Sequence, residues 1–193
     1  EDGQKMSKRL KNYPEVFYLL DKYGADSARY YLLTSPVVRG EEIRFSEKGV
    51  DEVYKKVLMR LQNVVSFLQT YGEINKTQKT KQKKQDTNIL DKWIFARLNE
   101  LTKQITEGME KYELDKATRP IEIFVDDLST WYLRRSRERF KSDDKDEKEN
   151  AVCNLMSALK DFSIVMAPFM PFMAEGIYQG VRFSEDLESV HLE

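Results

Sequence analysis

The sequence has few of the residues from which many sites and folds are built. Its 193 residues include one cysteine and one histidine, which excludes a disulfide framework, a multi-cysteine zinc site and most histidine-based catalysis. Only 8 glycines and 5 prolines are present, which argues against collagen, proline-rich linkers and turn-dense β-sandwiches. No apolar run approaches the roughly 20 residues that a membrane span requires. We therefore expect a cytoplasmic protein that has no membrane partner.

Charge is balanced over the whole chain. Its 32 lysines and arginines oppose 33 acidic residues and give a net charge of -1. That balance argues against a non-specific nucleic-acid coat, but it is compatible with a local basic surface. Hydrophobic residues make up 40% and charged residues 34%, a composition that fits a helix-rich protein. A chain of this length buries roughly 70% of its unfolded surface, so it needs neither a disulfide nor a metal to fold.

Helical periodicity runs along most of the chain, and the sequence has no convincing alternating strand pattern. Asp26, Ser46 and Asp115 are predicted N-caps because each stands before an apolar helical stripe. The fold class is therefore all-α, with a small connector in residues 1–45 followed by a helical bundle in residues 46–193. The expected helices are 14–23, 26–33, 46–71, 86–112, 115–141, one from the acidic tract 143–149 to 166, and 172–182.

Two details of these helices are open to a structural check. The apolar stripe of the helix 86–112 is expected to stay buried through Met109 and Tyr112 at its end. The tract 75–85, between two long helices, holds five lysines and no acidic residue. Such a tract buries too little apolar surface to fold, which predicts an exposed loop.

A short cationic motif stands near the N-terminus, where Lys5 and Lys8 flank Met6 and Ser7. Two lysines with a small hydroxyl between them could embrace a polyphosphate, because lysine supplies compact charge and serine a hydrogen bond. The alternative is a solvated basic terminus, which is the ordinary role of a short basic run. These four residues alone leave both interpretations open.

A second basic cluster lies within residues 131–141, which hold four arginines and one lysine against one acid. Guanidinium groups bind phosphate through paired hydrogen bonds, and aromatic rings stack on unpaired bases. The alternative is an exposed helix end whose cations interact favourably with the helix dipole and form ion pairs with the acidic tract 143–149. The candidate RNA contacts are Trp131, Arg134, Arg135, Arg137 and Arg139.

The other reactive residues favour structural roles. Asp126 and Asp127 are expected on a polar helix face, and Cys153 beside a core stripe as a buried structural thiol. His191 has no neighbouring ligand set, and the methionine-rich residues 166–173 are expected to form a packed corner between two helices. The sequence has no glycine-rich phosphate loop, no Ser/His/Asp set and no metal-ligand spacing, so no metal site is predicted.

The residues that follow the N-terminal motif support a functional interpretation of it. Residues 5–8 resemble the second signature of class I aminoacyl-tRNA synthetases, and residues 23–29 and 32–36 come next as in the isoleucyl, valyl and leucyl group. Two positions depart from the pattern. Arg9 stands where the signature usually continues with serine, and Lys11 stands where the family usually has glycine.

The resemblance extends over nearly the whole chain. Residues 37–50 and 124–137 look like the isoleucyl-tRNA synthetase family in particular, and residues 167–178 resemble the closing helix pair of the group. The chain is therefore similar to a fragment of that family, from the second signature through the anticodon-binding domain. The same region of a valyl- or leucyl-tRNA synthetase is the near alternative. A stand-alone helical RNA-binding or interaction module and a purely structural bundle are the more distant ones.

The resemblance implies a reaction for the parent enzyme. Isoleucine would be joined to ATP, with Mg²⁺ on the phosphates, and then transferred to its tRNA. Lys5 and Lys8 would be catalytic, stabilising charge on the leaving pyrophosphate, and with Met6 and Ser7 they would bind ATP. The bundle would bind the anticodon stem-loop of an isoleucine tRNA through Trp131 and the four arginines of its cluster.

The resemblance also implies partners and limits. Family members carry an upstream nucleotide-binding fold and an editing domain that residues 1–193 do not contain. We therefore expect the fragment alone to be inactive and to hold no cofactor of its own. Its expected partners are the tRNA and the missing catalytic domain of the same chain, and the expected oligomeric state is a monomer.

Overall fold

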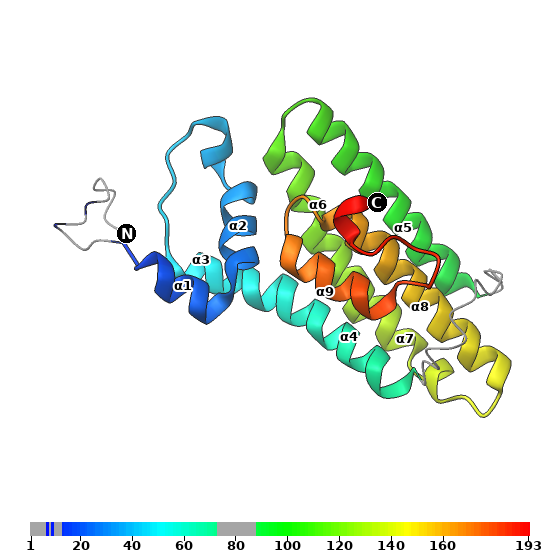
Figure 1. Cartoon of the computed structure of the whole chain (residues 1–193). Helices are drawn as coiled ribbons and strands as arrows, with labels where there is room; N and C mark the ends of the chain where they lie inside the picture. Colours follow the sequence, from blue (N-terminus) through cyan, green and yellow to red (C-terminus); the bar gives the residue numbers. More distant parts are fainter. Residues whose placement is uncertain (1–6, 8, 10–12, 73–87) are drawn as a thin grey trace.

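The computed structural model describes residues 7, 9, 13–72 and 88–193, and the regular elements among them are all helical (Figure 1). This confirms the predicted all-α class. None of the described helices is long and apolar enough to cross a membrane. The lysine-rich tract 75–85 lies outside the described residues.

The first part of the fold is a helical connector, drawn in blue in Figure 1. Gly24 ends its first helix at a φ of 80°, a left-handed conformation that glycine adopts without steric cost, so the chain turns directly into the second. Residues 41–46 then lead to the bundle without regular structure. The connector consists of α1 (Val16–Tyr23), α2 (Ala25–Thr34) and the 3₁₀ helix η1 (Pro36–Arg39).

The bundle comes next, and two of its long helical segments contain a π-helical stretch. A π turn inserts an extra residue and so changes which side chains face inward after it. Its elements are α3 (Glu47–Val53), η2 (Tyr54–Leu58), α4 (Met59–Tyr71), α5 (Ile89–Glu110), α6 (Leu114–Asp126), η3 (Asp127–Leu133), α7 (Arg134–Ser136), η4 (Arg139–Lys141), α8 (Lys145–Met166), α9 (Pro171–Val181) and η5 (Val190–Leu192).

Local hydrogen bonds explain where three bundle helices begin. Ser46 Oγ accepts the N–H of Gly49 at 3.2 Å, which confirms the predicted cap of the segment that runs to Tyr71. Asn88 Oδ1 accepts from the second residue of α5, and Asp144 Oδ1 accepts from the first turn of α8. Each cap satisfies a backbone donor that has no partner inside its helix.

Two aspartates that were predicted to be N-caps have other roles. Asp26 lies within the first turn of α2, and its carboxylate accepts backbone N–H groups at the start of α9, from Met173 at 2.6 Å. Asp115 is buried in the first turn of α6 and pairs with Arg39 and Arg119. These two predictions were wrong because each carboxylate serves a distant element, which spacing along the sequence does not reveal.

One continuous apolar core fills the bundle, with α5 packed along α6 and α8 along α9. The predicted stripe of α5 is wrong at its end, where Met109 is 37% and Tyr112 90% exposed. The helix ends at Glu110, and Tyr112 has a φ of 58°, so the chain turns toward α6 before these side chains reach the core. The largest buried side chains are Tyr30, Phe124, Tyr132, Phe140, Phe162, Phe169 and Tyr178.

The connector docks on the bundle through directional contacts. Tyr30 Oη donates to the Thr118 carbonyl at 2.8 Å, and Arg29 Nη2 donates to the Pro168 carbonyl at 3.0 Å. A small second core of Leu19, Tyr23 and Val50 joins α1 to α3. These contacts fix the connector at one end of the bundle (Figure 1).

Candidate nucleic-acid interface

The basic cluster lies on the irregular segment that joins α6 to α8. The segment continues α6 through η3 and α7 and then forms η4. Its inward-facing side chains are buried: Leu128, Tyr132, Ser136, Arg139 and Phe140. Its outward-facing basic and aromatic side chains are exposed: Trp131, Arg134, Arg135, Arg137 and Lys141.

Trp131 and Arg135 form a stacked pair at the centre of the exposed face. The guanidinium carbon of Arg135 lies 3.8 Å from the centroid of the Trp131 ring, and Trp131 is 46% exposed. The four-residue spacing places both on one side of the helix. An exposed indole with a cation stacked on it offers an aromatic surface to an unpaired base and positive charge to a phosphate.

Trp93 of α5 extends this aromatic surface. Its ring centroid lies 6.3 Å from that of Trp131, with an angle of 52° between the planes. One turn away, Arg97 Nε donates to Asp127 Oδ2 at 2.8 Å. Sequence reasoning missed Trp93 because only the packing of α5 against η3 brings it near Trp131. The one available signal was that Trp93 lies beside the apolar stripe of α5 rather than within it.

Two arginines on the exposed face keep their charge available. Arg134 and Arg135 are exposed, and neither takes part in an ion pair within the described part of the chain. Lys92, also exposed, precedes Trp93 on α5. The surface therefore combines a tryptophan pair with cations that no carboxylate among the described residues neutralises.

Arg137 and Lys141 lie on the side that faces α4. The Arg137 guanidinium lies 5.8 Å from the ring centroid of Phe67, and Lys141 Nζ lies 5.6 Å from that of Tyr71. Both cations remain exposed while their stems cover the aromatic edge of the core. Arg137 is thus on the surface, but on a different side of the segment from Trp131 and Arg135.

Arg139 does not belong to this surface, although it was a candidate RNA contact. Its side chain is 10% exposed, and its two Nη groups donate to the two carboxylate oxygens of Asp91 at 2.8 and 2.7 Å. An arginine whose fork is occupied by a buried carboxylate cannot also hold a phosphate. Arg139 stands seven residues after Tyr132, two helical turns on, so it falls on the buried side of the segment with Tyr132 and Ser136.

The acidic tract does not neutralise the exposed arginines. Among the described residues, the ion pair between the cluster and the tract 143–149 joins Arg139 Nε to Glu147 Oε1 at 3.9 Å. Asp144 instead caps α8. The alternative in which the basic cluster exists to pair with this tract therefore does not describe Arg134 or Arg135.

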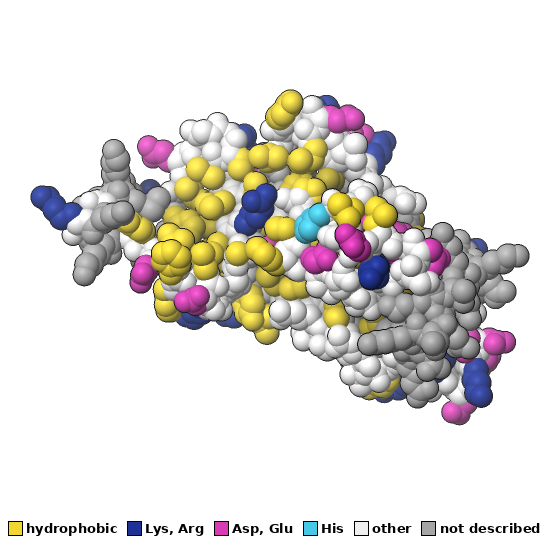
Figure 2. Space-filling model, viewed as in Figure 1, with side chains coloured by type: hydrophobic (Ala, Val, Ile, Leu, Met, Phe, Trp, Pro, Cys, Tyr) yellow, Lys and Arg dark blue, Asp and Glu magenta, His cyan; other side chains and the backbone are white. Residues whose placement is uncertain are grey.

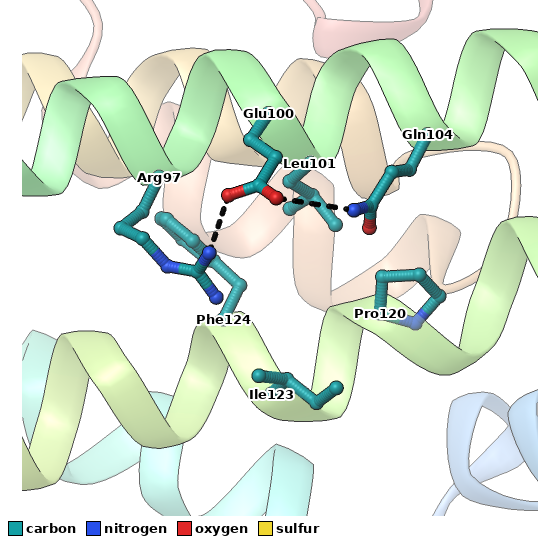
Figure 3. Close-up of a pocket in the computed structure, with 7 residues that line it drawn as sticks. All are labelled: Arg97, Glu100, Leu101, Gln104, Pro120, Ile123 and Phe124. Carbon is teal, nitrogen blue, oxygen red and sulfur yellow. Dashed lines mark hydrogen bonds and ion pairs between the residues drawn. The ribbon is translucent and has the colours of Figure 1, made fainter.

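Asp126 and Asp127 lie on a polar face and are engaged in ion pairs, the first with Arg60 and the second with Arg97. Arg97 also reaches Glu100, next to a small pocket between α5 and α6 (Figure 3). Hydrogen bonding to Asp127 raises the pKa of Arg97. The two charged side chains that line this pocket among the described residues, Arg97 and Glu100, are paired with each other.

The structure describes only Ser7 of the N-terminal motif. Lys5, Met6 and Lys8 lie outside the described residues, and Ser7 is half-buried. Within the described part of the chain, no group of three or more histidine, cysteine, aspartate and glutamate residues could hold a metal ion. The roles assigned to residues 5–8 therefore remain predictions.

The remaining candidates are structural. Cys153 is half-buried, not fully buried as predicted, and burial raises the pKa of its thiol, which makes it a poor nucleophile. The predicted corner at residues 166–173 is confirmed, because Met166, Phe169 and Met170 are buried there. His191 is exposed near the end of the chain.

Comparison with known proteins identifies the class. Residues 91–193, more than half of the chain, match the family described as the anticodon-binding domain of tRNA ligase. Residues 1–46 match the family of class I tRNA synthetases for I, L, M and V. The chain therefore belongs to the family of anticodon-binding domains of tRNA ligases.

Similarity to particular proteins then points to isoleucine. The chain is 44% identical over 194 residues to the isoleucine–tRNA ligase of Chlamydia pneumoniae and 45% identical over 193 residues to that of Chlamydia muridarum. Each match covers 100% of this chain and 19% of the relative, so the chain spans about a fifth of the length of these relatives.

A solved structure shares the fold. The LeuRS in the ternary complex of Agrobacterium radiobacter K84 LeuRS, tRNA and LeuAMS matches with a TM-score of 0.59 at 18% identity. The match covers 99% of this chain and 22% of that one. At this identity the likeness shows the fold of the connector and bundle and no more.

Proposed function

We propose that this chain is the part of an isoleucine–tRNA ligase that binds the anticodon stem-loop of its tRNA. The observation that carries the proposal is the exposed Trp131–Arg135 stack, with Arg134 beside it and unpaired among the described residues, in a chain of the anticodon-binding family. Guanidinium groups hold phosphates, and an indole stacks on the unpaired bases of a loop. Because the net charge is only -1, binding rests on this local surface.

The proposed contacts differ in role. Trp131, with Trp93 beside it, supplies the stacking surface. Arg134, Arg135 and Arg137 supply charge for the backbone of the loop and stem. Arg139 supports the surface from inside. Phosphate contacts of this kind fix the register of the RNA, and sequence preference has to come from the bases that stack on the tryptophans.

The activity of the whole enzyme is part of the same proposal. It would activate isoleucine with ATP and Mg²⁺ and attach it to tRNA. Lys5 and Lys8 would stabilise the leaving pyrophosphate and, with Met6 and Ser7, would bind ATP. The match of residues 1–46 to class I synthetases supports this assignment. Since the chain spans 19% of its relatives, we expect it to show no ATP–pyrophosphate exchange by itself.

The connector is proposed to be the contact with the rest of the enzyme, so that residues 1–45 belong with the catalytic domain and 46–193 form the bundle. Apolar side chains gather over the connector in Figure 2, and Val16 and Phe17 are 57% and 72% exposed. The chain spans 19% of its relatives' length, and we propose that the rest of such an enzyme covers these side chains. The apolar groove in the connector is lined by Tyr13, Pro14, Val16, Leu19, Leu20, Ala28, Leu32 and Phe45.

We propose that the protein is cytoplasmic and monomeric.

Binding to synthetic stem-loops tests the proposal. The chain is titrated with the anticodon stem-loop of an isoleucine tRNA and with the same stem carrying a scrambled loop, at one fixed salt concentration. We expect tighter binding to the native loop, because phosphate attraction alone is indifferent to sequence. Equal, salt-sensitive binding to both would overturn anticodon recognition. Stem-loops of valine and leucine tRNAs distinguish the isoleucine assignment from its near alternatives.

A further inference from the structure

We propose that the buried carboxylate of Asp91 positions the RNA-binding face, an inference that rests on the proposed function. Asp91 lies in the first turn of α5, and its side chain is 0% exposed. It therefore touches neither solvent nor RNA. Any effect on binding has to pass through the residues that it holds, which makes it a positioning residue.

The Asp91 carboxylate is fully engaged by three other elements. Its Oδ1 accepts from Tyr132 Oη at 2.7 Å and from Arg139 Nη1 at 2.8 Å. Its Oδ2 accepts from Arg139 Nη2 at 2.7 Å and from Asn154 Nδ2 at 2.8 Å. The donors come from η3, η4 and α8, so one side chain ties α5 to two points of the irregular segment and to α8.

The two donors on that segment bracket its exposed arginines. Tyr132 precedes Arg134 and Arg135, and Arg139 follows them, while the side chains of Tyr132 and Arg139 point inward. Between these anchors the helix changes from π-helical to α-helical and then ends at Ser136. So irregular a backbone leaves its rotation to side-chain contacts, and the two directional ones that flank the arginines go to a single carboxylate.

The same anchor sets the aromatic half of the site. Asp91 and Trp93 occupy one turn of α5, and Trp93 lies against Trp131. Holding α5 in register with η3 therefore also holds the two indoles in register. Asp91 is the residue through which the stacking surface and the arginines are aligned with each other.

The chemistry of the Asp91 network suits a role in positioning the RNA-binding face better than a role in adding net stability to the fold. A buried ion pair often contributes no more stability than apolar residues of the same volume, because removing both charges from water is costly. A polar network in which the carboxylate is fully satisfied does specify one geometry, since each hydrogen bond has a direction. Directional hydrogen bonds of this kind hold the indole and the guanidinium at the fixed spacing that the binding face needs.

The test compares two conservative variants with a core control. Arg139→Lys keeps the charge but loses the two-pronged contact, and Tyr132→Phe removes one hydroxyl. Ile105→Val removes a methylene from the buried face at the other end of α5. At a temperature where all are folded, we expect Arg139→Lys to raise the Kd for the native stem-loop about 5- to 10-fold and Tyr132→Phe to raise it less. The control should bind like the wild type.

The proposal is overturned if both variants bind the stem-loop as tightly as Ile105→Val does, whatever their melting temperatures. If Arg139→Lys does not fold, Tyr132→Phe decides the outcome alone, because it keeps the ring in the core. A loss of affinity in proportion to the unfolded fraction would likewise mean that the network only stabilises the fold.

A second readout separates this proposal from the proposed function. The chain has two tryptophans, so in a Trp93→Phe background the fluorescence reports Trp131 alone. We expect Arg139→Lys to change acrylamide quenching of Trp131, and Ile105→Val to leave it unchanged. If the wild type shows no preference for the native loop, the proposed function is wrong. Quenching then still tests whether the Asp91 network positions Trp131. Quenching and affinity that both match the control would reject the positioning itself.

Discussion

The Arg135 guanidinium lies 3.8 Å from the centroid of the Trp131 ring, on the exposed side of a helix whose opposite side is part of the core. The contact restrains the exposed Arg135 side chain and adds to the packing that holds Trp131 against Trp93. Less side-chain freedom is then lost when a ligand binds, which raises affinity without adding a contact. The relationship makes Trp131 and Arg135 a preorganised pair, and its two members can be tested separately.

Removal of the indole should weaken RNA binding without unfolding the protein. Stacking of a base on an aromatic side chain contributes roughly 1–3 kcal/mol, so Trp131→Ala should raise the stem-loop Kd accordingly, and Trp131→Phe less. The melting temperature should change little because Trp131 is 46% exposed. Tyr112→Ala, another exposed aromatic residue, is the control measured by the same titration. An unchanged Kd for Trp131→Ala would remove this residue from the site.

Removal of the exposed Arg134 and Arg135 should change how binding depends on salt. Each phosphate contact contributes a slope of about −0.7 to −0.9 to a plot of log K against log salt concentration. Arg134→Ala with Arg135→Ala should therefore make the slope shallower by about the amount of one phosphate contact or more. Lys103→Ala with Lys111→Ala changes the charge equally near the far end of α5, where Lys111 follows the last helical residue. A slope that responds equally to both pairs would mean that only net charge matters.

Much of the fold could be predicted because apolar spacing reports directly on a buried helix face. The stripe from Val50 through Val57 and Leu61 to Leu68 is buried at the predicted spacing, although it crosses the π-helical stretch η2. The N-cap at Ser46 followed from the same local logic. These features depend on residues within one or two turns of each other, which a sequence displays.

The site was less predictable because it depends on where helices meet. The basic cluster was visible in the sequence, yet Arg139 turns inward to Asp91 and Trp93 comes from another helix. The period does place Arg139 on the inner face, two turns after Tyr132, but a buried arginine needs a carboxylate partner, and Asp91 comes from another helix. Asp26 failed as a predicted cap for the same reason, since its partner Met173 is 147 residues away.

The contact between Asp26 and α9 should contribute measurable stability. Loss of a side chain that caps a helix N-terminus typically costs about 0.5–2 kcal/mol, and here the cap also joins the connector to the bundle. We expect Asp26→Ala to lower the free energy of unfolding in urea by that amount. Asp21→Ala, an exposed change in α1, should have little effect. Equal unfolding curves for the two variants would show that the contact is not stabilising.

The connector should lose stability in acid through Glu47. Its Oε1 accepts from Lys22 Nζ at 2.8 Å and from Tyr23 Oη at 2.9 Å, and these hydrogen bonds, with that from Lys22 the larger cause, lower its pKa. A carboxylate of lowered pKa stabilises the fold fully above its unfolded pKa of about 4.3. That contribution disappears as the pH falls through the lower, folded-state pKa.

Melting temperatures measured across that acidic range check the sign. The wild type should lose more stability below about pH 4.3 than Glu47→Gln does, because the variant has no carboxylate to protonate. Glu52→Gln, an exposed change on the same helix α3, should behave like the wild type. Parallel curves for the wild type and Glu47→Gln would show that the Lys22 contact has no part in acid unfolding.

Two glycines in helices should respond to alanine in opposite ways. At Gly108 in α5, an added Cβ would lie 2.9 Å from Ala117 N and Cβ, so the crossing of α5 and α6 would have to open. At Gly176 in α9, an added Cβ meets nothing within 4 Å. Overpacking typically costs about 1–3 kcal/mol, whereas alanine in place of a helical glycine gains up to about 1 kcal/mol.

We therefore expect urea unfolding to show Gly108→Ala less stable and Gly176→Ala more stable than the wild type. Each substitution adds the same methyl group and the same helix propensity, so the difference between them measures the close approach of α5 to α6. If both variants gained stability equally, the Gly108 contact would have to relax without cost. The packing that holds α5, and with it Asp91 and Trp93, would then be looser than the structure indicates.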